Sequence, residues 1–147
     1  MGPTTKLLGL LTASALAASA LAAGCGASSS GPYHLAGKVT YKGQPLPAGR
    51  IFFLPNTAKG NTGQGGYAEI KDGAYDTRNK GGATPGGPLV VRIDGFDGQS
   101  TTSNPVGQPL FLTYEVDFDA PCADSTRDFD VPASAGKNLP KGGGPPP

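Results

Sequence analysis

The sequence has few of the side chains on which catalytic sites usually depend. It contains no tryptophan, a single histidine (His34) and two cysteines (Cys25 and Cys122). A nucleophilic hydrolase needs a base beside its nucleophile, and His34 is the only imidazole in the chain. The carboxylates of Asp117 and Asp119 share one strand face and would lack the unequal environments that separate an acid from a base. We therefore expect neither an enzyme nor a bound cofactor.

An excess of positive charge is also lacking. Twelve basic and eleven acidic side chains give a formal net charge of +1, and the lysines and arginines form no run along the chain. Binding to a phosphate backbone needs clustered basic side chains. Nucleic acid is therefore not an expected partner.

Aromatic residues make up 7% of the chain and charged residues 16%, whereas glycine (24) and proline (15) are abundant. Such a composition favours turns over long helices. It predicts an all-β domain with a modest core rather than a helical bundle.

The chain lacks a hydrophobic run long enough for a typical membrane helix. Residues 7–23 are apolar or small throughout, but Ala, Ser and Thr dilute the run, and a spanning helix needs about 20 strongly apolar residues. Lys6 precedes the run and small residues end it, which is the pattern of a secretory signal. We expect a cleaved signal peptide over residues 1–24 rather than a retained helix.

The run ends in Ala23-Gly24-Cys25, which resembles the lipobox of bacterial lipoproteins. The resemblance implies that the signal peptide is cut off immediately before Cys25 and that Cys25 carries diacylglycerol. Fatty acids such as palmitate would then anchor the protein in a membrane of the cell envelope, on the exported side. Residues 25–32 would then be a flexible tether. Ala22 departs mildly from the common pattern, which has Leu there. Cleavage by ordinary signal peptidase, for example after the Ala-x-Ala of residues 20–22, is the alternative.

The second cysteine, Cys122, has two possible states. An exported domain with two cysteines can form one disulfide. If Cys25 carries lipid, we expect Cys122 to be a partly buried thiol beside Pro121.

Alternation of apolar and polar residues predicts about seven short strands. They cover residues 34–41, 48–55, 67–71, 74–77, 89–94, 109–119 and 128–131. Asp72-Gly73 lies between two of them and favours a two-residue type I′ turn. The predicted fold is a seven-stranded β-sandwich of Ig-like or prealbumin-like topology over residues 33–131, followed by a disordered Gly/Pro tail over residues 132–147.

The longest predicted strand alternates over residues 109–119. Its buried face is expected to hold Leu110, Leu112, Tyr114, Val116 and Phe118, and its polar face Phe111, Thr113, Glu115, Asp117 and Asp119. Glu115, Asp117 and Asp119 suggest a calcium site, since carboxylate oxygens are the ligands that Ca²⁺ prefers. The alternative is a solvated face whose acidic side chains oppose edge pairing.

The stretch from Leu35 to Pro55 resembles the opening of carboxypeptidase-regulatory-like (transthyretin-like) domains. Gly43-Gln44-Pro45-Leu46 and Phe53-Leu54-Pro55 carry the resemblance, and Asp72-Gly73-Ala74-Tyr75 and Pro85-Gly86 extend it across residues 33–131. It implies a transthyretin-like β-sandwich and non-catalytic roles, such as folding aids beside peptidases, adhesive or carbohydrate-facing modules, and stalks.

We therefore expect a membrane-anchored envelope lipoprotein whose β-sandwich has a structural or protein-interaction role. Its partners would be membrane lipid and an unidentified envelope protein or glycan. The alternative is a binding module for glycan or calcium that uses loops 56–66 and 95–109 and the acidic strand. Tyr33, Tyr67 and Tyr75 are the tyrosines near loops that could meet a glycan.

Overall fold

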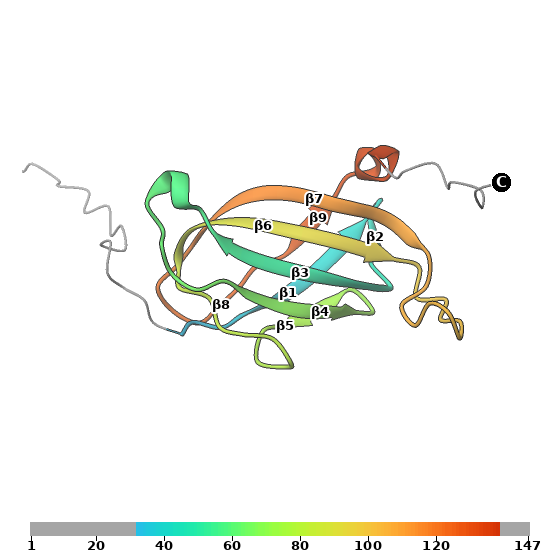
Figure 1. The fold of residues 1–147 in the computed structure, drawn as a ribbon, viewed down its shortest axis with the longest axis horizontal. Helices are drawn as coiled ribbons and strands as arrows, with labels where there is room; N and C mark the ends of the chain where they lie inside the picture. Colours follow the sequence, from blue (N-terminus) through green and yellow to red (C-terminus); the bar gives the residue numbers. More distant parts are fainter. Residues whose placement is uncertain (1–31, 139–147) are drawn as a thin grey trace, which may run out of the picture.

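The computed structural model describes residues 32–138, which form nine strands and two 3₁₀ helices (Figure 1). The strands are β1 (Leu35–Tyr41), β2 (Gln44–Pro45), β3 (Ala48–Pro55), β4 (Gly66–Lys71), β5 (Ala74–Asp76), β6 (Gly87–Phe96), β7 (Pro109–Ala120), β8 (Ser125–Thr126) and β9 (Phe129–Val131). The helices are η1 (Thr57–Lys59) and η2 (Ala133–Asn138). The predicted all-β class is confirmed.

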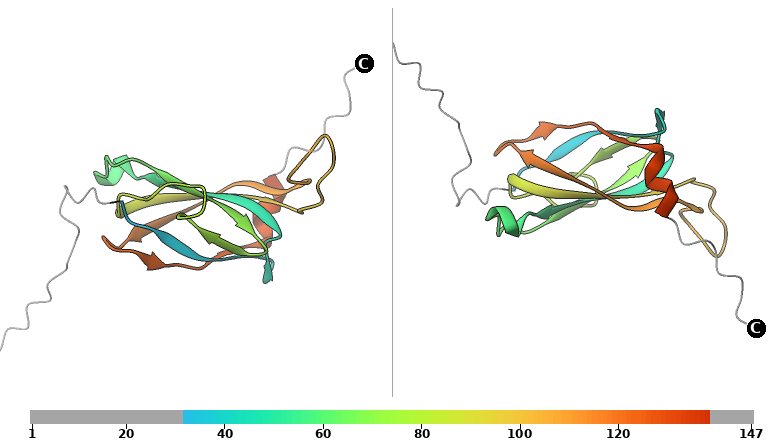
Figure 2. Two further views of the ribbon diagram at one scale, coloured as in Figure 1. Left: turned by 90° about the horizontal axis from the view of Figure 1, so that it is seen from below. Right: turned by 90° about the horizontal axis from the view of Figure 1, so that it is seen from above.

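Seven strands follow one another in a single curled sheet, in the order β2-β1-β5-β4-β3-β6-β7, and β8 and β9 pair in parallel with β1. The curl forms two layers, with β1 and β9 opposite β6 and β7 (Figure 2). Ring contacts join the layers: Tyr41 lies 4.9 Å from Phe111, and Phe118 lies 5.9 Å from Phe129, between ring centroids. The fold is therefore a small β-sandwich.

The core consists of alternate side chains of the strands. Every second residue of β1, β3 and β6 points between the layers, which is the geometry that an extended strand imposes. The fully buried large side chains include Leu35, Val39, Leu46, Ile51, Phe53, Ile70, Leu89, Val91, Ile93 and Phe111. The inward positions predicted for the first strand are thus confirmed for Leu35 and Val39.

Two tight turns connect neighbouring strands. Asp72 (φ 48°) and Gly73 (φ 75°) both have positive φ, as the predicted type I′ turn requires. Lys42 (φ 53°) and Gly43 (φ 73°) form a second turn of this kind between β1 and β2. The sequence indicated only a connection at this second site, because β2 is two residues long and contains a proline.

The alternation predicted for residues 109–119 is confirmed for Leu110, Tyr114, Val116 and Phe118, which pack against the core, and is wrong at Phe111 and Leu112. Phe111, expected on the polar face, is fully buried, and Leu112, expected in the core, is 38% exposed. Two register shifts between β6 and β7 explain the change, one between Ile93 and Gly95 and one between Gly95 and Phe96, and Thr113 has φ 57°. Each shift turns the side chains beyond it to the opposite face, so the second shift restores the predicted side.

The glycine opposite Phe111 makes room for its ring. A Cβ on Gly95 would lie 2.4 Å from Cε1 of Phe111, and the two residues are register partners. Only a residue without a side chain fits at this position.

Strand β3 lies at the centre of its layer, between β4 and β6, as its apolar run predicted. Burial on both faces is not complete, because Leu54 is 38% exposed. The second face of β3 is therefore partly open to solvent.

The chain continues past the last strand as η2, where a disordered tail was predicted. Ala135 packs against the core from this helix. Residues 139–147 of the predicted tail lie outside the described residues, as do residues 1–31, which include the predicted signal peptide and Cys25.

Candidate functional site

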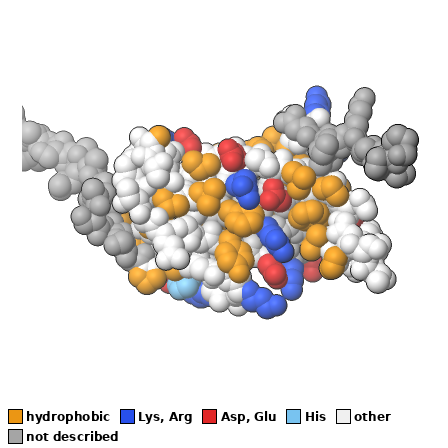
Figure 3. All heavy atoms as spheres, in the orientation of Figure 1, with side chains coloured by type: hydrophobic (Ala, Val, Ile, Leu, Met, Phe, Trp, Pro, Cys, Tyr) orange, Lys and Arg blue, Asp and Glu red, His pale blue; other side chains and the backbone are white. Residues whose placement is uncertain are grey.

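The half of the sheet formed by β4, β3, β6 and β7 presents its outer face to solvent (Figure 3). Direct cross-strand pairing places four side chains in one row across this face: Tyr67, Phe52, Arg92 and Glu115. We call these four residues the outer row. Hydrophobic side chains gather across the middle of the face in Figure 3, with acidic and basic side chains between them.

Aromatic and cationic groups contact each other within the outer row. The rings of Phe52 and Tyr67 lie 6.2 Å apart with an interplanar angle of 31°, and the guanidinium carbon of Arg92 lies 4.7 Å from the centre of the Phe52 ring. Such a cation–π contact contributes about 0.5–1 kcal/mol at an exposed site. Tyr67 is 43% exposed, so its ring is available to a ligand.

The polar groups of the outer row have few partners within the described part of the chain. Arg92 Nε is buried without a hydrogen-bond partner, and neither Arg92 nor Glu115 forms an ion pair there. A buried unpaired donor is costly, and functional sites are one place where native proteins retain such groups.

Two further rows flank the outer row. Leu54, Val90 and Asp117 form one of them. Glu69, Arg50 and Asp94 form the other. The face therefore combines apolar side chains with charged side chains of both signs.

The structure separates the three residues proposed for calcium. Alternate residues of a strand lie about 7 Å apart, so Glu115, Asp117 and Asp119 do not converge on one point. Asp117 instead pairs with Lys59 Nζ at 2.8 Å, and this hydrogen bond, with the carboxylate charge, raises the pKa of Lys59. No group of three or more candidate metal ligands occurs among residues 32–138.

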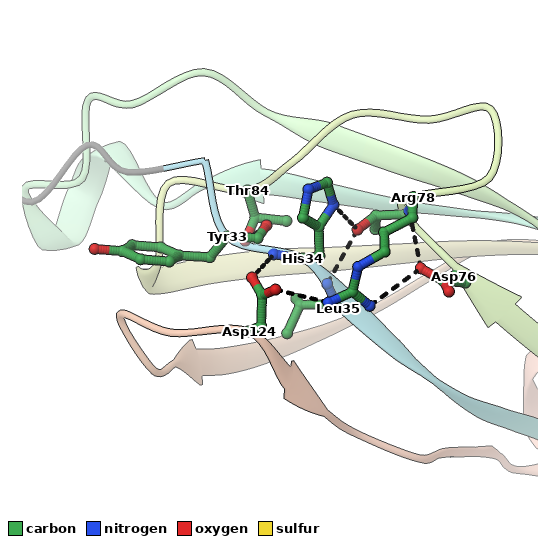
Figure 4. A network of polar contacts seen from close by, with 8 residues as sticks. Tyr33, His34, Leu35, Asp76, Arg78, Thr84 and Asp124 are labelled. Carbon is green, nitrogen blue, oxygen red and sulfur yellow. Dashed lines mark hydrogen bonds and ion pairs between the residues drawn. The ribbon is translucent and has the colours of Figure 1, made fainter.

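The single histidine belongs to a polar network at the start of β1, which we call the His34 cluster (Figure 4). Asp124 accepts hydrogen bonds from the His34 backbone N–H at 2.8 Å and from Arg78 Nη2 at 2.6 Å. These contacts, led by the His34 N–H, lower the pKa of Asp124. The cluster ties the first strand to a segment 90 residues later in the chain.

A histidine beside a hydroxyl can indicate nucleophilic catalysis, and His34 Nδ1 lies 3.4 Å from Thr77 Oγ1. Thr77 is only 2% exposed, and its hydroxyl accepts a hydrogen bond from the Leu35 N–H at 3.0 Å. A substrate cannot reach this hydroxyl, so the contact holds the beginning of β1 in place.

The tyrosines and loops named as glycan contacts fall in different environments. Tyr75 is 4% exposed in the core, and Tyr33 is half-buried where its backbone pairs with Thr84. Loop 56–66 is tied to β6, since Asn61 Nδ2 donates to the carbonyls of Gly86 and Pro88. Of the three tyrosines, only Tyr67 lies on the outer face.

Sequence reasoning missed Phe52 and Arg92 as site residues. Both were placed correctly in strands, but neither has a local motif that marks binding. Their contact depends on the register between β3 and β6, which strand alternation alone does not determine.

A groove of about 420 Å³ lies between Pro32, the segment just before β4 and residues 82–85. Its lining is Pro32, Gln64, Gly65, Gly82, Ala83, Thr84 and Pro85. It contains no charged side chain, whereas binding sites for small molecules usually combine an apolar lining with convergent polar groups.

Cys122 is half-buried, as expected, but it is disulfide-bonded. It was expected to be a thiol if Cys25 carries lipid, so the disulfide matches the other predicted state. The second cysteine of the chain, Cys25, lies outside the described residues.

Within residues 32–138, no helix has the length and apolar character needed to cross a membrane. Comparisons of the whole chain with models of protein families, with characterised proteins and with solved structures find no match.

Proposed function

We propose that this protein is a lipid-anchored component of the bacterial cell envelope, in which a non-catalytic β-sandwich presents its outer sheet face to a partner. The observation that carries the anchor is Ala23-Gly24-Cys25 at the end of an apolar run. The observation that supports binding is the outer row, where aromatic and charged side chains contact each other on the solvent-facing side of the sheet.

Substitution of Cys25 by serine tests the anchor. In the lipoprotein pathway the sulfur of this residue accepts the lipid before the leader is cut, so Cys25→Ser removes incorporation of a labelled fatty acid and leaves the leader uncut at residue 24. Cys122→Ser is the matched control and retains the label. A Cys25→Ser protein that still incorporates the label, or an original protein that never does, would contradict lipid anchoring at Cys25.

The disulfide of Cys122 opposes the lipid anchor if its partner is Cys25, and this conflict supplies a second test. One sulfur cannot hold both a thioether to lipid and a disulfide, so the two fates of Cys25 exclude each other. Intact mass without reductant separates them: the lipidated protein has the mass of the chain that begins at Cys25 plus its diacylglyceryl and any N-acyl group, whereas a protein with a disulfide between its own two cysteines has the mass of its polypeptide less two hydrogens. The second result would contradict lipid anchoring through Cys25.

A further inference from the structure

We propose that the outer row and its two flanking rows bind a neutral polysaccharide, laid across β4, β3, β6 and β7. The inference rests on the proposed function, because it names the chemical class of the partner that the anchored domain would hold. Shape, dimensions, charge and exposed apolar surface each bear on the choice of ligand.

The shape of the face excludes a compact small molecule. Sites for such ligands are concave and bury most of the ligand surface. The outer face is the exposed side of a sheet, and no residue of the outer row or of its two flanking rows lines the groove described above. A ligand of this face must therefore be extended and able to bind with one side only.

The three rows match the dimensions of a short stretch of polysaccharide. Four strands about 4.8 Å apart span about 14 Å, and the outward residues from Arg50 to Leu54 span about 13 Å along β3. The rows therefore have room for a few sugar rings.

The charges of the face nearly balance. Lys59 pairs with Asp117 at 2.8 Å, and Lys71 lies 3.8 Å from Glu69. Arg50 and Arg92 remain, opposite Asp94 and Glu115 in strand register. Asp119, whose charge also acts on Lys59, leaves one acidic side chain in excess, so the face gives no attraction for an acidic polymer. Sugar hydroxyls both donate and accept hydrogen bonds, so they suit guanidinium and carboxylate groups alike.

The apolar part of the face suits the C–H side of a sugar ring. Tyr67 is 43% exposed and Leu54 is 38% exposed. Beside them, Arg92 lies over the ring of Phe52 with no other partner for its side chain among the described residues. The face therefore offers an aromatic ring for stacking and, next to it, hydrogen-bonding groups for hydroxyls.

Calorimetric titration of the full-length protein in detergent tests the inference. The probes are neutral hexasaccharides of glucose and mannose in α and β linkages, with hexaguluronate as an acidic probe of equal length. We expect at least one neutral hexasaccharide to bind. Tyr67→Ala should weaken its binding by at least about tenfold, and Tyr67→Phe, which keeps the ring, should retain binding within about threefold. Arg92→Lys keeps the charge but loses the planar group, and should weaken binding several-fold.

Val106→Ala is the control for exposed apolar surface, because Val106 is 37% exposed in the loop after β6. It should leave binding unchanged. The thermal transition of each variant, measured in the same buffer, checks that the sandwich is folded, so that loss of binding by Tyr67→Ala is not loss of structure.

Three results would overturn the inference: binding of hexaguluronate alone or of no probe, binding unaffected by Tyr67→Ala, or a concentration-dependent dimer in sedimentation that Tyr67→Ala dissociates. The last would assign the face to a second copy of the chain. The unlipidated Cys25→Ser protein should bind as the original does. If the lipid-anchor proposal is wrong, polysaccharide binding is therefore unaffected. If the polysaccharide proposal is wrong, lipid anchoring through Cys25 is unaffected.

Discussion

Phe52 and Phe53 are neighbours in β3 with the same side chain and opposite environments. Phe53 is fully buried and lies within 6.4 Å of two other aromatic rings, those of Tyr75 and Phe129. Phe52 lies on the outer face, half-buried beneath Arg92. The comparison separates two uses of one sheet: the inner face stabilises the fold, and the outer face has aromatic side chains that the core does not need.

The largest expected effect comes from the inner phenylalanine. Phe53→Ala should lower the free energy of unfolding by about 3–5 kcal/mol, because it removes a fully buried ring and leaves a cavity. Phe52→Ala should cost about 1 kcal/mol or less, since it removes one cation–π contact and partly exposed surface. Urea denaturation of both proteins measures the difference. Equal losses would show that the two faces are not distinct in stability.

The next effect concerns packing within the inner face. Gly95→Ala should cost about 1–3 kcal/mol, because its methyl group would overlap the Phe111 ring. In a Phe111→Leu background the same substitution should cost less, since the two sites contact each other directly. A double-mutant cycle by chemical denaturation measures the coupling. Additive losses would contradict the packing of Phe111 against Gly95.

Two tyrosines, one on each face of the sheet, test the same comparison of inner and outer faces through the removal of a single hydroxyl group. The Tyr75 hydroxyl donates a hydrogen bond of 2.7 Å to the Arg127 carbonyl, and burial raises the pKa of Tyr75 well above its usual value. Tyr75→Phe should cost about 1 kcal/mol. Tyr67→Phe should change the unfolding free energy little, because Tyr67 lies on the outer surface. If Tyr67→Phe were the more destabilising, the assignment of inner and outer tyrosines would be wrong.

The smallest effect belongs to the exposed His34 cluster. Because the pKa of Asp124 is lowered in the folded protein, its stabilising contribution is fully present above its ordinary pKa of 3.8 and is lost as the pH falls through the lower folded value. Asp124→Ala should therefore lower the melting temperature slightly at pH 6, and the difference from the original protein should shrink as the pH falls below 3.8. A difference in melting temperature that grows toward low pH would contradict the lowered pKa of Asp124.

Local patterns predicted much of the inner face and little of the outer one. Leu35, Val39 and the Asp72-Gly73 turn could be identified because strand period and turn conformation depend on adjacent residues. Phe111 could not be placed, since the register shifts between β6 and β7 reverse the faces locally and have no clear signal in the sequence. The outer row depends on the register across four strands, which the sequence does not determine. Glu115 was therefore named only as a calcium ligand and Tyr67 only as a tyrosine near a loop, and Arg92 was missed.

The parallel pairing of β1 with β9 has a consequence for the order of folding. Lys38 N–H donates to Asp128, and the Thr40 hydroxyl donates to Asp130, each across 90 residues of chain. During synthesis β1 emerges first, yet its β9 side stays unpaired until the last strand is made. Contacts so distant in sequence form slowly, because the intervening chain must first be brought together. The finished sandwich therefore cannot form before nearly the whole chain has been synthesised.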